Sequence, residues 1–213
     1  MIFDYLIENW RRVLELTLDH LRLSLTAVAL ALIVAFPLGI VATRFRRLTL
    51  PVLSGLGAIY TVPSLAFLAF LIPSLGIGRD NALVVLAAYA QIFLVRNIVA
   101  GLRGVDAGTL EAAQGLGLTP LQVFWQVRWP LALPIMLAGV RTAIVATISL
   151  ATVAAWVDAG GLGRLLFEGI TRDHPARIVA GATAVISLAL VTDALLRLAE
   201  RSTAIARARR AAR

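Results

Sequence analysis

The sequence lacks cysteine and lysine altogether, and histidine occurs only at His20 and His174. Without cysteine the chain can form no disulfide, no thiolate nucleophile and no cysteine-based metal site. Without lysine it cannot supply the phosphate-binding loop G-x-x-x-x-G-K-[ST], and its two histidines are too far apart for an H-E-x-x-H metal motif. No paired-carboxylate site is evident either. These absences argue against a redox, metal or nucleotide-hydrolysing enzyme, and no catalytic or metal-binding residue is predicted.

Charged residues are also scarce over long stretches, and residues 48–78 contain none. Hydrophobic residues make up 60% of the 213 residues, whereas soluble domains contain roughly 45–50%. The uncharged runs reach the length of about 20 apolar residues that a helix needs to cross a bilayer. They have no polar face that could meet water. The composition therefore predicts an all-α membrane protein.

Five core transmembrane helices are expected, at residues 23–43, about 51–74, 82–102, 134–157 and 178–199. They are joined by a turn at 76–81, a polar segment at 103–130 and an external polar-amphipathic loop at 158–177. The second run is too long for one straight helix, and Pro63 within it lacks the N–H that a helix interior needs. A break or kink near Pro63 is therefore expected.

Residues 3–19 show the i, i+3, i+4 spacing of an amphipathic helix, with charged residues mostly on the opposite face. We interpret residues 1–19 as a helix lying at the membrane interface, with Trp10 at headgroup level. The alternative is that they form the first turns of the next helix. The acidic start MIFDYLIENW lacks a basic n-region, so no cleavable signal peptide is expected. The permease domain then covers 20–200, followed by a basic tail at 201–213.

The distribution of arginine predicts the orientation, because cytoplasmic loops carry the excess of basic residues. Ten arginines lie at 44–47, 103–130 and 201–213, whereas seven lie before residue 23, at 76–81 and at 158–177, together with eight acidic residues. Five spans then place the N-terminus outside and the C-terminus in the cytoplasm. The tail is expected at an anionic membrane surface, at about 1 kcal/mol per basic residue, rather than on nucleic acid.

The polar segment between the third and fourth spans carries the signals of two short helices. Asp106 is a suitable N-cap for a first helix that continues through Gln114. Gly115 and Gly117 are expected to end this helix, because glycine adopts the left-handed conformation that commonly follows a helix. Glu111 is expected near the start of the helix, where the helix dipole favours an anion.

The second short helix is expected to begin at Thr119, with Pro120 at its first position. Gln122 stands three residues after Thr119, as in a capping box. Pro130 and Pro134 are expected to end this helix and to begin the fourth span. These features predict a compact helix-turn-helix on the cytoplasmic side. An ordered surface loop is an equal alternative on this evidence alone.

The same segment resembles the EAA loop of ATP-binding cassette (ABC) importer permeases, whose pattern is E-A-A-x-x-x-G, nine residues, then I-x-L-P. The matching residues are Glu111, Ala112, Ala113, Gly117, Val127 and Pro130, and Trp129 stands where an aliphatic residue is usual. Four further stretches resemble the osmoprotectant branch, which carries glycine betaine, choline and carnitine: YTVPSLAFLAFLIPSLGIG (60–78), RN (96–97), AGVRTA (138–143) and AGGLG (159–163). The resemblance covers about residues 20–195.

In that family the EAA loop forms a coupling helix that sits in a cleft of a separate ATP-binding subunit. The resemblance implies that Glu111 meets a basic group there, that Ala112 and Ala113 allow close packing, and that Gly117 makes the turn. The remaining residues assigned to the coupling loop are Gly115, Thr119, Pro120 and Pro130. ATP and magnesium would bind the partner subunit, and no cofactor is expected on this chain.

The implied assembly contains two permeases, either copies or paralogues, two ATPase subunits and an extracytoplasmic substrate-binding protein, in a bacterial inner membrane. The expected function is import of quaternary-ammonium osmoprotectants by alternating access. One alternative keeps this role for an amino acid or another small solute. A stand-alone secondary transporter is a further alternative, but it would need ionisable residues at mid-membrane, and the span centres contain few.

Polar residues inside the spans are candidates for the translocation path, namely Thr61, Ser64, Tyr89 and Gln91. Hydrogen bonding between helices is the alternative for each of them. Arg141 and Asp193 are charges within apolar spans, where charges are costly and often functional. The alternatives are a structural ion pair or, for Asp193, pairing with Arg197 at i, i+4.

Overall fold

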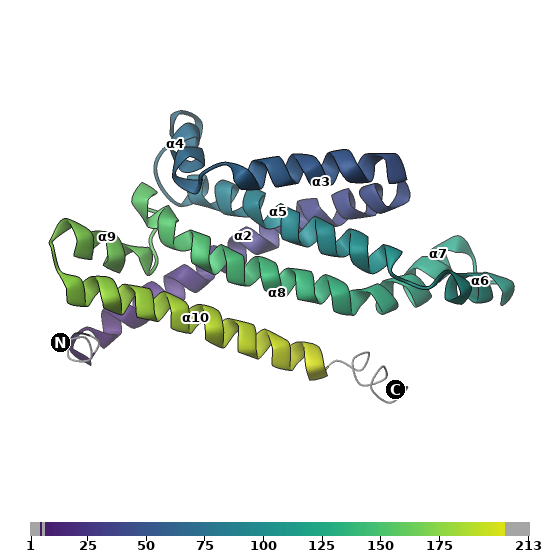
Figure 1. The fold of residues 1–213 in the computed structure, drawn as a ribbon. Coiled ribbons are helices and arrows are strands. Elements are labelled where there is room, and N and C mark those ends of the chain that lie inside the picture. The colour runs from purple at the N-terminus through teal and green to yellow at the C-terminus, as the bar shows by residue number, and fades with distance from the viewer. Residues whose placement is uncertain (1–4, 6, 203–213) are drawn as a thin grey trace.

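The computed structural model describes residue 5 and residues 7–202, and every element in this part of the chain is helical (Figure 1). The elements are α2 (Trp10–Arg44), α3 (Arg46–Thr61), α4 (Ser64–Leu75), α5 (Arg79–Arg103), α6 (Ala107–Gly115), α7 (Pro120–Gln122), the π-helical segment η1 (Val123–Arg128), α8 (Trp129–Ala154), the 3-10 turn η2 (Ala155–Val157), α9 (Gly163–Thr171) and α10 (Pro175–Ser202).

Helix α5 forms the centre of the bundle and packs against both α2 and α8. In its most apolar stretch 61% of the residues are buried, compared with 17% for the peripheral α10. Small residues permit this packing, since a β-carbon at Gly39 would lie 2.5 Å from Cγ2 of Ile98, and one at Gly139 would lie 2.3 Å from Cβ of Asn97. Close approach of backbones at glycine is a general means of helix association in membranes.

Four helical runs are long and apolar enough to cross a membrane: α2, α5, the run from Pro120 to Val157, and α10. The pair α3 and α4 makes a fifth if it is counted as one span, but it is bent by 93°. Val62 and Pro63, the residues between these two helices, are extended. The break expected near Pro63 is therefore present.

The N-terminal helix is not separate from the first span over its described part. Helix α2 runs without interruption from Trp10 to Arg44. It has no break near residue 19 because no proline or glycine occurs before Pro37. The boundary expected at residue 19 is wrong, and residues 10–19 are the first turns of the spanning helix. Most of the expected tail at 201–213 lies outside the described residues, apart from the last two residues of α10.

A second correction concerns Pro130 and Pro134, which do not end a helix. The chain is helical from Pro120 to Val157, with Pro130 in the first turn of α8 and Pro134 inside it. The π-helical segment before Pro130 explains this, because the Trp129 N–H bonds to Phe124 O, five residues earlier. The turn is widened where the proline lacks its N–H, so the helix continues.

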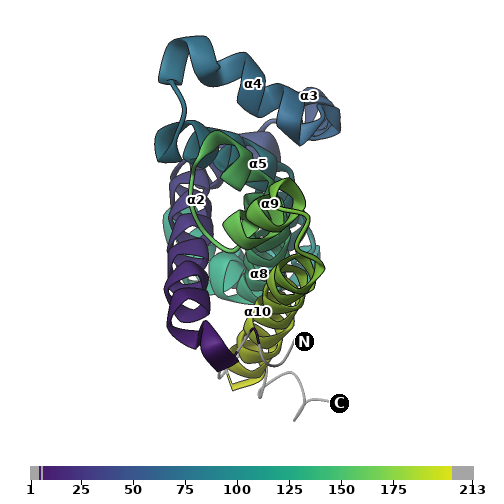
Figure 2. The ribbon, with the colours of Figure 1, turned by 90° about the vertical axis from the view of Figure 1, so that its left-hand side faces the viewer.

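The two ends of the bundle differ in composition. The α2–α3 turn, the C-terminal end of α5 and the hairpin of α6 and α7 lie at one end, and the C-terminal end of α10 points the same way (Figure 1). The start of α2, α4 and α9 lie at the other end. Seen along the bundle, α3 and α4 lie on one side and α10 on the opposite side (Figure 2). The arginine-rich segments at 44–47 and 103–130 thus share an end.

Candidate functional site

Helix α6 begins as its sequence predicts. The Oδ2 of Asp106 accepts hydrogen bonds from the backbone N–H of Thr109 at 2.8 Å and from its hydroxyl at 3.2 Å. A carboxylate at this position satisfies an N–H that the helix leaves without a partner. The start of the hairpin is therefore fixed by a local cap.

The end of α6 is a Schellman motif. The N–H of Leu118 donates to Ala113 O at 3.3 Å, and the N–H of Gly117 donates to Gln114 O at 2.9 Å. Gly117 has a φ of +85°, a conformation that costs other residues about 1–2 kcal/mol. Gly115, by contrast, is the last residue of α6 itself. Only one of the two expected glycines therefore makes the turn.

The second helix of the hairpin starts with the expected capping box. The backbone N–H of Thr119 donates to Oε1 of Gln122 at 2.8 Å, and the hydroxyl oxygen of Thr119 accepts from the Gln122 N–H at 3.4 Å. Pro120 occupies the first turn. With caps on both sides, the four residues between α6 and α7 form a defined connection.

The tip of this hairpin presents an acidic group among exposed apolar side chains. Glu111 and Ala112 are exposed and Ala113 is buried, while Leu116 and Leu121 are 82% and 69% exposed. Glu111 is the fifth residue of α6, and no acidic residue lies in the first turn. The expectation that the helix dipole favours its charge is therefore wrong, because that effect is confined to the first turn.

Two contacts join the helices on either side of the hairpin, α5 and α8, to α2. The guanidinium of Arg103 donates to Ala42 O at 2.9 Å, and to the hydroxyl of Thr49, which itself donates to Ala42 O at 2.8 Å. A cation thus meets the C-terminal carbonyls of α2, where the helix dipole is negative. Trp129 packs edge-to-face on Phe36 of α2, with ring centroids 5.0 Å apart. Sequence reasoning missed Arg103, which it only counted as a cytoplasmic charge.

A hollow of about 410 Å³ lies between the hairpin and the end of α2. Its wall includes Leu110 and Gln114 of α6, Pro120 of α7, and the basic side chains of Arg44 and Arg128. The hairpin therefore has a basic recess on its inner side and the carboxylate of α6 on its exposed surface.

The structure gathers three of the four path candidates at the break between α3 and α4. The hydroxyl of Tyr89 donates to Val62 O. Thr61 is exposed and its hydroxyl donates to Ala58 O at 2.7 Å, and Ser64 is the first residue of α4. Helix positions 89 and 91 point to opposite sides of α5. Accordingly Gln91 faces α2, where its amide donates to Ala31 O at 3.0 Å.

The charges of Arg141 and Asp193, which lie within α8 and α10, belong to one network. Arg141 on α8 pairs with Asp193 at 2.8 Å and with Glu200 at 3.0 Å, both on α10. Asp193 also pairs with Arg197 at 2.7 Å. The structural ion pair of Arg141 with Asp193 and the i, i+4 pairing of Asp193 with Arg197 are therefore both present. Glu200 was missed because it is 59 residues from its partner.

At the opposite end, the AGGLG stretch is bound to α2. Asp19 pairs with Arg79 at 2.9 Å and accepts from the Gly161 N–H at 2.8 Å. The Nδ1 of His20 accepts from the Leu162 N–H at 3.2 Å, so Nε2 carries the hydrogen and donates to a carbonyl of α8. The loop after α8 is thereby joined to the start of α2.

The chain has several apolar helices around a central one and a doubly capped polar hairpin at its arginine-rich end. This arrangement is that of an α-helical membrane-transport subunit. The chain belongs to the family of binding-protein-dependent transport system inner membrane components, whose family model matches residues 21–205.

Named relatives and solved structures agree with this family. The choline transport system permease protein OpuBB of Bacillus subtilis is 40% identical over 200 residues, which cover 94% of this chain and 92% of the relative. The carnitine transport permease protein OpuCB of Listeria monocytogenes is 40% identical over 192 residues, covering 90% and 88%. A crystal structure of an amino acid ABC transporter matches with a TM-score of 0.78 at 19% identity, covering 94% of this chain and 98% of that one. An inward-facing structure of the MetNI methionine ABC transporter gives 0.71 at 21% identity, covering 87% and 95%. At these identities the two structures establish the fold alone.

The Schellman motif makes a local prediction. Gly117→Ala places a β-carbon at a φ of +85°, which should weaken the turn by about 1–2 kcal/mol. Hydrogen exchange of the Leu118 amide, measured in detergent, should become about 5- to 30-fold faster, since 1.4 kcal/mol is a factor of ten. The matched control is Gly115→Ala, where a β-carbon meets no atom within 4 Å and alanine favours the helix. Equal exchange in the two variants would contradict the assignment of the turn to Gly117.

Proposed function

We propose that this chain is the membrane subunit through which an ATP-driven bacterial importer carries quaternary-ammonium osmoprotectants, such as glycine betaine, choline or carnitine, into the cell. The observation that carries the proposal is the exposed, doubly capped hairpin with the Glu111-Ala112-Ala113 sequence, in a chain 40% identical to permeases named for choline and carnitine transport. The chain itself hydrolyses nothing. ATP and magnesium bind a separate ATPase subunit.

The hairpin is the docking point for that ATPase. Leu116 and Leu121 are large apolar side chains exposed at its tip, and such side chains gathered on a surface commonly mark protein contacts. Glu111 offers a carboxylate to a basic group of the partner, and Ala112 leaves room for a close approach. Arg103 ends α5 and Trp129 begins α8, so their contacts with α2 couple both helices that flank the hairpin to a third helix. Alternating access then follows from movement of the whole bundle against a second permease copy or paralogue.

Charge reversal at Glu111 tests this docking. Glu111→Arg should remove an attraction and add a repulsion, so we expect the ATPase to co-purify at a small fraction of the wild-type amount. Permease in the membrane fraction should be unchanged. Glu8→Arg is the control, because Glu8 is also exposed but stands two residues before α2, and the start of α2 lies at the other end of the bundle. Wild-type co-purification and wild-type ATP hydrolysis by the Glu111 variant would refute the coupling role.

The orientation follows from the shared end of the arginine-rich segments, which we place in the cytoplasm. The start of α2 and the 158–177 loop then face the outside, where an extracytoplasmic binding protein delivers the solute. The chain contains no cysteine, so single cysteines can be introduced without background. In intact cells, a membrane-impermeant maleimide should label Asn9→Cys and leave Ile205→Cys unlabelled. The reverse pattern would place the hairpin outside and exclude ATPase docking.

The pairing of Arg141 is compatible with a solute that carries a shielded positive charge. Arg141, a basic residue within a span, is neutralised by Asp193 and Glu200, so it is not available to bind an anion. The test is ATP-dependent uptake by proteoliposomes that contain this permease, its ATPase and its binding protein. We expect uptake of radiolabelled choline or glycine betaine, with competition by the other quaternary ammonium compounds. Uptake of an amino acid without such competition would refute the substrate class and leave the permease role intact.

A further inference from the structure

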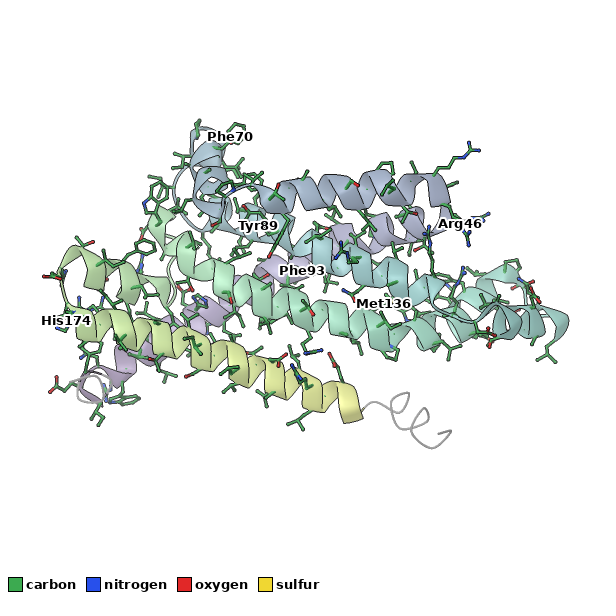
Figure 3. All side chains as sticks on the ribbon, in the orientation of Figure 1. Arg46, Phe70, Tyr89, Phe93, Met136 and His174 are labelled. Atoms are coloured by element: carbon green, nitrogen blue, oxygen red, sulfur yellow. The ribbon has the colours of Figure 1, made fainter. Side chains whose placement is uncertain are left out.

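Four aromatic rings meet at the break between α3 and α4. The ring centroids of Phe93 and Tyr60 are 5.2 Å apart, those of Tyr60 and Tyr89 are 5.7 Å apart, and those of Tyr89 and Phe67 are 5.8 Å apart. All three contacts are edge-to-face, with interplanar angles of 81° to 85°. We call these four residues the aromatic cluster. Tyr89 and Phe93 lie along the middle of α5 (Figure 3).

The aromatic cluster lies at the depth of the membrane centre. Tyr89 is ten residues from Arg79 and 14 from Arg103, which begin and end α5. At 1.5 Å per residue these separations are about 15 Å and 21 Å along the helix axis. The Tyr89 hydroxyl donates to Val62 O, so the break itself is at the same depth.

This break cannot face lipid. Thr61, Val62 and Pro63 are exposed in the single chain, and Val62 and Pro63 are not helical. Non-helical backbone at membrane depth is tolerated only where it is buried in protein or lines a water-filled cavity. Helix α3, which precedes the break, has no buried residue at all. The exposed side of the break therefore faces a route or another protein.

The chemistry of this surface favours a route for a cation. Residues 48–78 carry no charge, so neither a salt bridge nor a fixed counter-ion is available from α3 or α4. On α5 the one charged residue between Asp80 and Arg103 is Arg96, which is exposed one turn after Phe93. Tyr60 is 42% exposed, and the ring of Phe93 is partly exposed beside it. Aromatic ring faces attract quaternary ammonium groups within about 6 Å of the ring centroid. They do so without the strong, directional bonds that would hold a passing solute.

We infer that the aromatic cluster is a transit site for the quaternary ammonium group halfway across the membrane, with Tyr60 and Phe93 offering the ring faces and Tyr89 holding the break in place. This inference rests on the proposed function, because it assigns the solute's positive group to a site in the permease itself.

The experiment compares uptake per ATP hydrolysed in the reconstituted wild-type complex and its variants. Tyr60→Leu and Phe93→Leu keep apolar bulk but remove a ring face, and each should lower choline uptake about fivefold at a given rate of ATP hydrolysis. Tyr60→Phe keeps the ring face and should retain most of the wild-type uptake. The control is Phe70→Leu, because Phe70 is 77% exposed on α4, away from the aromatic cluster (Figure 3), and uptake by this variant should equal that of the wild type.

A second series separates cation binding from packing. Phenylalanine analogues with one, two and three ring fluorines at position 93 keep the ring but weaken its negative face, so uptake should fall stepwise with each fluorine. Equal uptake by all the fluorinated variants, or wild-type uptake by both leucine variants, overturns the inference. Reduced assembly of the permease with normal uptake per assembled complex also overturns it, because the surface would then be a contact between permeases. Failure of the wild-type complex to carry any quaternary ammonium compound refutes the proposed function instead.

Discussion

The bilayer interior offers no water to backbone N–H and C=O groups, and this constraint governs the structure. Helices α2, α5 and α8 satisfy it by running continuously through their apolar lengths. Where the backbone departs from a helix at membrane depth, a side chain compensates, since the Tyr89 hydroxyl donates to the carbonyl of Val62. At the end of α2 the guanidinium of Arg103 serves the same purpose for the carbonyl of Ala42. Polar side chains thus serve the main chain at these two places where a helix ends or breaks.

Close packing of these helices depends on small residues, because two apolar helices gain little from the hydrophobic effect in lipid. Gly39 and Gly139 bring α2 and α8 against the central α5, one on Ile98 and the other on Asn97. The long side chains lie mostly on the outside, as Ile33 and Leu190 illustrate at 71% and 65% exposure. Such surfaces are suited to lipid or to further subunits.

The features that could be predicted are those with a local cause. Asp106 caps α6 through a residue three positions away, and Thr119 caps α7 in the same way. The apolar runs and the break near Pro63 follow from composition and from one missing N–H. The hydrogen bonds from Arg103 to Ala42 and from Arg141 to Glu200 join residues that are 61 and 59 positions apart, and no periodic pattern in the sequence indicates them. Only the fold brings those groups together.

The rule that proline ends a helix failed at Pro130 for a related reason. It considers one residue at a time, whereas the preceding π-helical turn had already changed the hydrogen-bond pattern. The ring arrangement of the aromatic cluster was also beyond prediction. Tyr60 is on α3 and Tyr89 is on α5, and their contact depends on how these two helices pack together.

The uninterrupted helix from Pro120 to Val157 has a mechanical consequence. Gly139, which packs on Asn97 of α5, divides it into arms of about 28 Å and 27 Å at 1.5 Å per residue. A lever with its fulcrum at that point has nearly equal arms. A sideways displacement of the hairpin at one end would then give an opposite displacement of similar size at the loop beside Asp19 and His20. Opening on one side of the membrane and closing on the other would be two results of a single tilt.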